Sequence, residues 1–561
     1  MLSTLPPELL VKTLSCLDIY GLHTVYLVNR DFAAFIKENE SVIYHNAAIY
    51  HGFIGPRDLQ PKDARKTYPG RWLDNLSGWK DLCRRFLQLE YNWEARGEVP
   101  SVHLYSRTGP HTHRFKLDER EGRRFIISTY KGGGLRVTCM VTNTVLFDLD
   151  DEYVRFYAHC EYDNDYLIFD RLHPHSLEIW RLESDDWDGI AINSTYKPDQ
   201  MMLDIASQAR DSDLPYPRRG HFAPWALFTP SQPPRAYRFV HPTLLVGSER
   251  GQELYLFDAP SASLINTIPL PPSLQINILY VEIGARHAFV CTPHHVLIFS
   301  RDWNHDGNAD NLHSIFLRFP SPDPELPSSR LSRHNAARLK RLESGSIYKS
   351  RYIVCAPEPE SPQANSAVSR QPEMLHEFTA VHVSPSGEDF VAINSSGLIY
   401  FVRNFERVFR GEASFSDVTL CLELDSPALN LAYEFDRVIV QTLGWGIYVF
   451  SLHNDEMPPY NLVKGWNNQI NESDDERENS LGFIHPYPSI TASSFLQLQT
   501  YNRTRLSCLK LTKTGVWMEQ IIQPIWRAAF NRNENLDFHP CVVHVSFAPS
   551  ISHVRVAEEQ Q

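Results

Sequence analysis

The sequence has no excess of basic residues and no long apolar run, and these absences exclude two classes of protein. Lysine and arginine number 54 against 67 aspartates and glutamates, which gives a formal net charge of −13. Broad binding to nucleic-acid phosphates depends on clustered lysine and arginine, so this charge argues against it. No run of about 18 apolar residues occurs, and a membrane-spanning helix needs one. We therefore expect binding neither to nucleic acid nor to membrane.

Cysteine pairs and catalytic motifs are also missing. The nine cysteines are scattered, odd in number and include no C-x-x-C pair, so neither a disulfide framework nor a zinc ribbon is indicated. The chain has no G-x-S-x-G, H-E-x-x-H or P-loop motif, which are common signatures of hydrolases, metalloproteases and nucleotide-binding enzymes. These features predict an intracellular protein, cytoplasmic or nuclear or both, without a recognisable active site.

The first fifty residues carry the strongest local pattern. Pro6 and Pro7 stand where the first turn of a helix accepts proline, and Glu8 adds a negative charge that favours a helix N-terminus. Apolar residues then recur at helical spacing, and residues 18–21 predict a break before a second helix and a third one around Phe32. Three helices this short cannot hide all their leucines, and burying each fully is worth about 1.5–3 kcal/mol. We predict that part of this surface binds a partner.

The order and spacing of these residues resemble the F-box, a motif that docks on the Skp linker subunit of cullin-RING ubiquitin ligases. Ile43-Tyr44 departs from the Leu-Trp that many F-boxes have. The resemblance implies contact with the linker subunit, and through it with a cullin. The residues that it implies for this contact are Leu5, Pro6, Leu9, Leu10, Leu14, Leu17, Leu22, Val28, Arg30 and Phe32. The alternative interpretation is a helical cap whose leucines belong to an ordinary core.

Residues 51–97 predict a connector that ends in one long helix. Trp79, Phe86 and Trp93 lie on a single apolar stripe of that helix. The charged residues off this stripe, among them Arg84 and Arg85, are predicted to face solvent. A helix of this kind, ending in Asn-Trp, resembles the bridge between F-box and propeller in F-box/WD-repeat proteins.

From residue 98 the hydrophobic period changes from 3.6 to 2, as expected for short β-strands. Seven strand-like segments contain an aromatic anchor, namely Phe147, Trp180, Phe257, Phe299, Phe401, Phe450 and Trp517. Repeated strands with one aromatic anchor per unit predict a β-propeller. We predict seven blades, with six or eight as the alternatives.

The predicted architecture is therefore multidomain, α plus all-β. It comprises an F-box at 1–50, a helical linker at 51–97 and a propeller at 98–561. Polar stretches near 193–234, 301–376 and 454–485 are predicted to be exposed loops inserted between blades. The glycines at 132–134, between two alternating segments, predict a hairpin turn rather than a phosphate-binding loop.

One polar segment has the residue types of a calcium loop. Asp302, Asn304, Asp306 and Asp310 could supply the oxygen ligands that calcium requires, and the segment resembles the calcium loops of integrin-type propellers. His313 stands where an EF-hand has glutamate, so only a shorter loop remains; an ordinary Asp/Asn/Gly turn is the alternative. We expect no other cofactor.

Taken together, the sequence predicts a non-catalytic substrate-recognition adaptor of an SCF-type ubiquitin ligase. The helices would dock on the Skp linker subunit, and the propeller would bind a target protein. Two alternatives remain. The propeller could have an enzymatic or calcium-dependent binding activity of its own, or the chain could be an F-box protein that acts outside ubiquitination.

Overall fold

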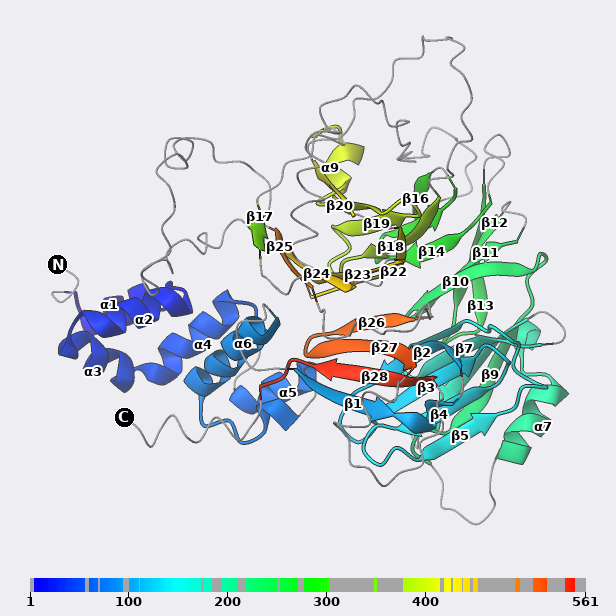
Figure 1. The fold of residues 1–561 in the computed structure, drawn as a ribbon, viewed down its shortest axis with the longest axis horizontal. Coiled ribbons are helices and arrows are strands. Elements are labelled where there is room, and N and C mark those ends of the chain that lie inside the picture. Colours follow the sequence, from blue (N-terminus) through cyan, green and yellow to red (C-terminus); the bar gives the residue numbers. More distant parts are fainter. Residues whose placement is uncertain are drawn as a thin grey trace, which may run out of the picture.

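The protein consists of a group of short helices followed by a ring of β-sheets (Figure 1). The computed structural model describes residues 5–55, 60–68, 71–93, 100–109, 111–172, 176–183, 194–209, 218–249, 253–270, 277–293, 295–301, 348–350, 377–413, 418–424, 427–435, 437–443, 447–452, 490–494, 508–521 and 540–549.

The helical part contains four successive helices, a connecting segment and one longer helix. These elements are α1 (Pro7–Leu14), α2 (Ile19–Val28), α3 (Arg30–Glu38), α4 (Glu40–Tyr50), η2 (Pro61–Asp63), α5 (Ala64–Thr67), η3 (Arg71–Leu73) and α6 (Trp79–Trp93). The Asp18 carboxylate accepts the N–H of Gly21 at the start of α2, and the Asn29 side chain accepts the N–H of Phe32 at the start of α3. The break predicted at 18–21 is wrong in its position, because Asp18 caps a helix that runs through Gly21.

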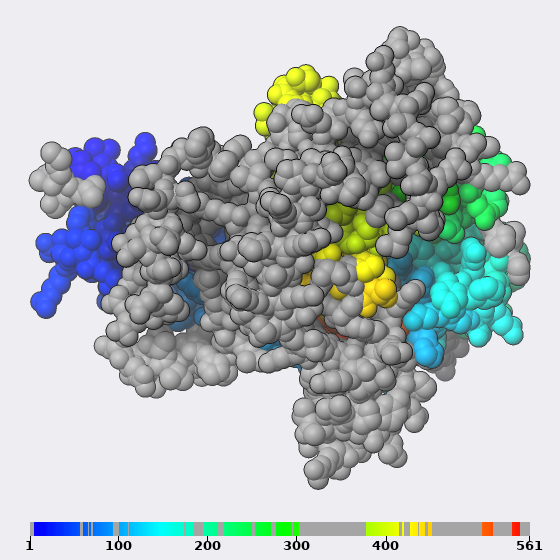
Figure 2. Space-filling view, turned by 45° about the horizontal axis from the view of Figure 1, so that its top comes forward, coloured from blue at the N-terminus to red at the C-terminus, as the bar shows by residue number. Residues whose placement is uncertain are grey.

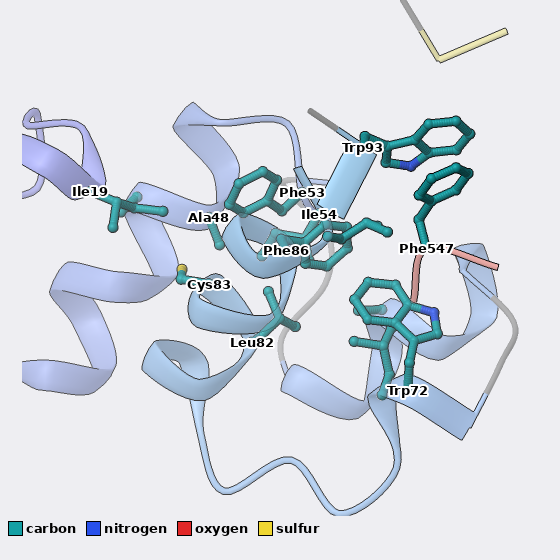
Figure 3. Packing of buried hydrophobic residues seen from close by; sticks show 14 of the residues in the cluster. Ile19, Ala48, Phe53, Ile54, Trp72, Leu82, Cys83, Phe86, Trp93 and Phe547 are labelled. Atoms are coloured by element: carbon teal, nitrogen blue, oxygen red, sulfur yellow. The ribbon is translucent and has the colours of Figure 1, made fainter. Parts of the chain in front are cut away.

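Helices α4 and α6 share the core of the helical part (Figure 3). Phe53, just after α4, stacks on Phe86 of α6 with ring centroids 4.6 Å apart. The prediction that Arg85 faces solvent is wrong. Its side chain is only 4% exposed and pairs with Asp81 at 3.0 Å, and it also donates to the carbonyl of Trp72 at 2.7 Å. The buried guanidinium therefore provides a hydrogen-bond donor for a backbone carbonyl of the connecting segment.

Seven antiparallel sheets form the ring, and we number them as blades in chain order. Blade 1 contains β2 (Thr112–Asp118), β3 (Phe125–Tyr130), β4 (Leu135–Cys139) and β5 (Val145–Leu149); blade 2 contains β6 (Cys160–Asp163), β7 (Tyr166–Asp170), β8 (Leu177–Leu182) and β9 (Phe222–Phe228). Blade 3 contains β10 (Pro234–Val240), β11 (Thr243–Ser248), β12 (Glu253–Asp258) and β13 (Ser263–Pro269); blade 4 contains β14 (Tyr280–Ile283), β15 (His287–Cys291) and β16 (Val296–Ser300).

The remaining three sheets complete the ring. Blade 5 contains β18 (Phe378–Val383), β19 (Phe390–Asn394), β20 (Leu398–Val402) and β21 (Thr419–Glu423). Blade 6 contains β22 (Ala428–Glu434), β23 (Arg437–Thr442), β24 (Ile447–Leu452) and β25 (Ile490–Ser494), with β17 (Tyr348–Ser350) as a fifth strand. Blade 7 contains β26 (Leu509–Thr512), β27 (Gly515–Ile521), β28 (Pro540–Ser546) and β1 (Ser101–Tyr105). The prediction of a seven-bladed β-propeller is confirmed.

The ring closes by pairing its two ends. The inner strands β2, β6, β10, β14, β18, β22 and β26 follow one another around the axis in chain order. Strand β1, the first of the ring, pairs antiparallel with β28, the last, so that Ser101 lies opposite Ser546 and Tyr105 opposite Val542. Blade 7 thus joins residues separated by more than four hundred positions, and opening the ring requires breaking this sheet.

Part of the stretch near 193–234 that was predicted to be an exposed insertion is ordered structure. Helix α7 (Gln200–Ala209) packs Met202 and Ala206 into the cluster between blades 1 and 2. Strand β9 is the fourth strand of blade 2. Its sequence, FAPWALF, is almost wholly apolar, but prolines and charges on both sides hide it from a composition-based prediction. The glycines at 132–134 do form the turn between β3 and β4, and Gly133 has a φ of +96° that favours glycine.

Hydrophobic clusters fill the spaces between neighbouring blades and continue into the helical part.

In the described part of the chain, no helix combines the length and apolar character that crossing a membrane would require.

Candidate protein-docking surface

Helices α1 and α2 expose large apolar side chains at one end of the molecule. Leu9 on α1 is 50% exposed, and Leu27 and Val28 at the end of α2 are 61% and 63% exposed. This part of the chain protrudes from the body of the protein (Figure 2, dark blue). Single exposed apolar residues are common, but several on two short adjacent helices are a feature of binding surfaces.

The ten residues that the F-box resemblance implies divide between core and surface. Leu10, Leu14 and Leu22 are buried in the cluster that joins α1, α2 and α4, so they support the surface instead of forming it. Leu5, Leu17 and Phe32 are half-buried and pack against that cluster. Pro6, Leu9, Val28 and Arg30 are exposed. Leu27 is exposed but was not among the implied residues; its place beside Val28 at the end of a largely apolar helix was the available signal.

Hydrogen bonds hold the orientation of α2. The backbone N–H of Ile19 donates to Nε2 of His51, which lies just after α4, at 3.0 Å. Burial lowers the pKa of His51, which keeps the ring neutral and Nε2 able to accept. Lys80 of α6 pairs with Glu40 of α4 at 3.1 Å. Helix α2 is therefore fixed to the end of α4, and α4 is in turn fixed to α6.

Helix α6 joins this unit to the propeller through its last turn. The indole of Trp93 stacks on Phe547, just after β28, with ring centroids 4.0 Å apart (Figure 3). Its N–H donates to the carbonyl of Lys513 at 3.0 Å, and the Asn92 amide donates to the carbonyl of Phe547 at 2.8 Å. The guanidinium carbon of Arg437 on β23 lies 4.9 Å from the centroid of the Trp93 ring, and the guanidinium pairs with Glu90. Blades 6 and 7 thus hold the helix.

A ladder of charged side chains joins the inner strands of five blades. Glu161 of β6 accepts from Lys116 of β2 at 2.7 Å and lies 3.1 Å from Arg238 of β10. Arg238 also pairs with Glu282 of β14 at 2.7 Å, and Glu282 lies 3.0 Å from His382 of β18. Burial opposes ionisation of both glutamates, but their cationic partners hold the pKa of each below its usual value. Each of the two glutamates therefore has its charge partners within the ladder.

The predicted calcium residues Asp302, Asn304, Asp306 and Asp310 lie outside the described residues, so that prediction stays open. Over the described ranges, no group of three or more histidine, cysteine, aspartate or glutamate side chains is arranged to hold a metal ion.

No family model matches the sequence, and no curated protein matches it. Among solved structures, the WD40 repeats of RRP9 match at a TM-score of 0.41 and 8% identity, covering 80% of this chain and 99% of that one. Raptor from Chaetomium thermophilum matches at a TM-score of 0.43 and 8% identity, covering 94% of this chain and 38% of that one. The β-propeller fold is therefore assigned from the strand pairing alone.

Proposed function

We propose that this chain is a non-catalytic adaptor of an SCF-type ubiquitin ligase. The helical part docks on the Skp linker subunit, and the propeller holds a protein for ubiquitin transfer by another subunit. The observation that carries the proposal is the exposure of Leu9, Leu27 and Val28 on helices whose sequence resembles an F-box. The firm joint at Trp93 supports it, because an adaptor must hold its target at a defined distance from the ligase.

Co-purification tests the docking. We expect the full-length chain to retain a co-expressed Skp linker subunit. The double variant Leu9→Glu, Val28→Glu should retain at least tenfold less of it, because each substitution buries an unpaired charge in the interface. Both positions are exposed in the chain itself, so its thermal unfolding midpoint should not change.

The matched control is Val141→Glu, a position 57% exposed on the turn between β4 and β5 of the propeller. It should retain the linker fully. Undiminished capture by the double variant would contradict the docking. Linker capture without recruitment of a cullin would contradict the ligase role and favour an F-box protein that acts outside ubiquitination.

A further inference from the structure

Phe156 and Tyr157 form an exposed aromatic pair on the propeller. They lie in the connection from β5 to β6 and are 55% and 61% exposed. They are the only exposed phenylalanine, tyrosine or tryptophan side chains among the described residues of the ring. Exposed aromatic residues at a loop offer large contact area at small cost in side-chain entropy, which is why they are frequent anchors in interfaces.

The turn between β3 and β4 holds this connection in place. The Tyr157 N–H donates to the Tyr130 carbonyl at 3.3 Å, and the Gly134 N–H donates to the Val154 carbonyl at 3.2 Å. The Tyr157 ring also meets the His113 ring edge-on, with ring centroids 5.4 Å apart. Because the backbone is fixed at two points, binding a partner here costs little loop ordering.

Three consecutive acids precede the aromatic pair in the same connection. Asp150, Asp151 and Glu152 are all exposed. Asp151 lies against the same turn, since a Cβ placed on Gly133 would be 3.1 Å from the Cβ of Asp151. Asp150 uses one carboxylate oxygen to accept the N–H of Tyr153 at 3.0 Å. Among the residues that the structure describes, no cation pairs with Asp151 or Glu152.

The cations near the pair have acidic partners of their own. Lys131, in the turn between β3 and β4, lies 3.5 Å from Glu519. Arg155, within the connection, has the buried carboxylate of Asp170 as a counter-charge. Burial and nearby cations lower the pKa of His113 to about 3, so its ring is neutral at physiological pH. The negative charges are therefore the ones left for a partner.

The aromatic pair and the helical part lie on opposite faces of the ring. Asn92 and Trp93 of α6 donate to the carbonyls of Phe547, just after β28, and of Lys513, between β26 and β27. Successive connections of an antiparallel blade alternate between its two ends. The connection from β5 to β6 is therefore at the end of the blades that α6 does not cover, and the helical part leaves it accessible.

We propose that this surface, formed by Asp151, Glu152, Phe156 and Tyr157, binds a basic segment of a partner protein. The stems of arginine and lysine side chains pack on the two rings, guanidinium groups stack on them, and the charged ends reach the two carboxylates. The net charge of −13 attracts a cationic segment and repels nucleic-acid phosphates. The proposal rests on the proposed adaptor function in naming its class of target, but the binding itself does not require the helical part to dock on anything.

Fluorescence anisotropy with the full-length chain tests this surface. The probes are two labelled twelve-residue peptides, one of alternating arginine and serine and one of alternating glutamate and serine. We expect the arginine peptide to bind at least tenfold more tightly than the glutamate peptide and to weaken as salt is raised from 50 to 500 mM. A single-stranded RNA of twenty nucleotides should bind less tightly than the arginine peptide.

Two pairs of substitutions locate the binding, since any acidic protein attracts an arginine peptide. Phe156→Ser with Tyr157→Gly leaves the charge unchanged and should weaken the arginine peptide at least tenfold; glycine suits the φ of +54° at 157, so the fold is kept. Asp151→Asn with Glu152→Gln should weaken it at least fivefold, and both positions are exposed, so the substitutions leave the core intact.

The matched control for charge is Glu249→Gln with Glu388→Gln. These exposed glutamates lie in turns of blades 3 and 5, and their substitution removes the same charge as the acidic pair, so binding should change less than twofold. Equal weakening by both acidic pairs, undiminished binding by the aromatic variant, or tighter binding of the glutamate peptide or the RNA would overturn the proposal. The linker-docking variant Leu9→Glu, Val28→Glu should bind the arginine peptide normally, so the two proposals fail separately.

Discussion

At the scale of single residues, His544 shows how one side chain makes the closing blade sensitive to acid. It lies on β28 and stacks on Trp517 of β27 with ring centroids 4.0 Å apart and the planes nearly parallel, at 4°. Only 9% of the residue is exposed, and burial together with the nearby His103 lowers its pKa to about 3. The site favours the neutral imidazole, because protonation would place a charge in a buried position beside His103.

This arrangement predicts a loss of stability in acid. The folded state binds the His544 proton at lower pH than the unfolded chain, so the contribution is complete above about pH 6.5 and decreases as pH falls toward 3. Near pH 5 the loss from this residue should approach about 1.4 kcal/mol per pH unit. Urea unfolding at pH 7.5, 6.0 and 5.0 measures it. His544→Phe keeps an aromatic ring against Trp517 and should reduce the pH dependence by that amount; an unchanged slope would contradict the assignment.

At the scale of elements, α6 shows which features can be read from the chain and which cannot. Its apolar stripe, including Phe86 and Trp93, was predicted from spacing and is buried in the structure. The burial of Arg85 could not be predicted, since its partners include the carbonyls of Trp72 and Asp74, which come near only after the connecting segment folds. The same holds for the exposed surface of α1 and α2: the motif names its residues, but only the packing separates Leu9 from the buried Leu10.

The joint between α6 and the propeller yields a second prediction. Trp93→Ala removes the stack on Phe547 and the bond to the Lys513 carbonyl, and it should cost about 3–5 kcal/mol, as expected for a large buried aromatic side chain. Hydrogen exchange should accelerate in α6 and at the end of β28 more than in blades 2 to 4. Arg84→Ala, an exposed position on the same helix, is the control and should leave exchange unchanged. Uniform acceleration over all blades would contradict a local joint.

At the scale of the whole molecule, the aromatic anchors favoured seven blades without fixing the number, and they do not occupy equivalent strands. Trp180, Phe257, Phe299, Phe401 and Phe450 lie in the third strands of blades 2 to 6. Phe147 lies instead in the fourth strand of blade 1, and Trp517 lies in β27, the second strand of blade 7 counted outward from the inner strand β26.

Ring closure by β1 and β28 was not predictable, because no local pattern marks a pairing over such a separation. The charged ladder was equally hidden, since its five residues come from five different blades.

That ladder predicts how the blades depend on one another. Arg238 is the only side chain of the ladder that pairs with two glutamates, Glu161 and Glu282, and both are almost fully buried. Arg238→Met should therefore cost about 3–5 kcal/mol in urea unfolding, because it removes one cationic partner from each of two buried carboxylates. Adding Glu282→Gln should recover part of this loss, since the neutral amide carries no uncompensated charge.

The matched control is Arg410→Met. Arg410 pairs with Glu412 at 2.6 Å, but both side chains are about half exposed, so the same chemical change should cost no more than about 1 kcal/mol. If Arg238→Met and Arg410→Met have equal effects, the ladder does not stabilise the ring. If the loss at Arg238 is large and Glu282→Gln recovers none of it, the cost arises from lost packing of the arginine stem and not from the charge of Glu282. A large loss with partial recovery would identify electrostatic pairing across the inner strands as a force that holds successive blades together, in addition to the hydrophobic clusters between them.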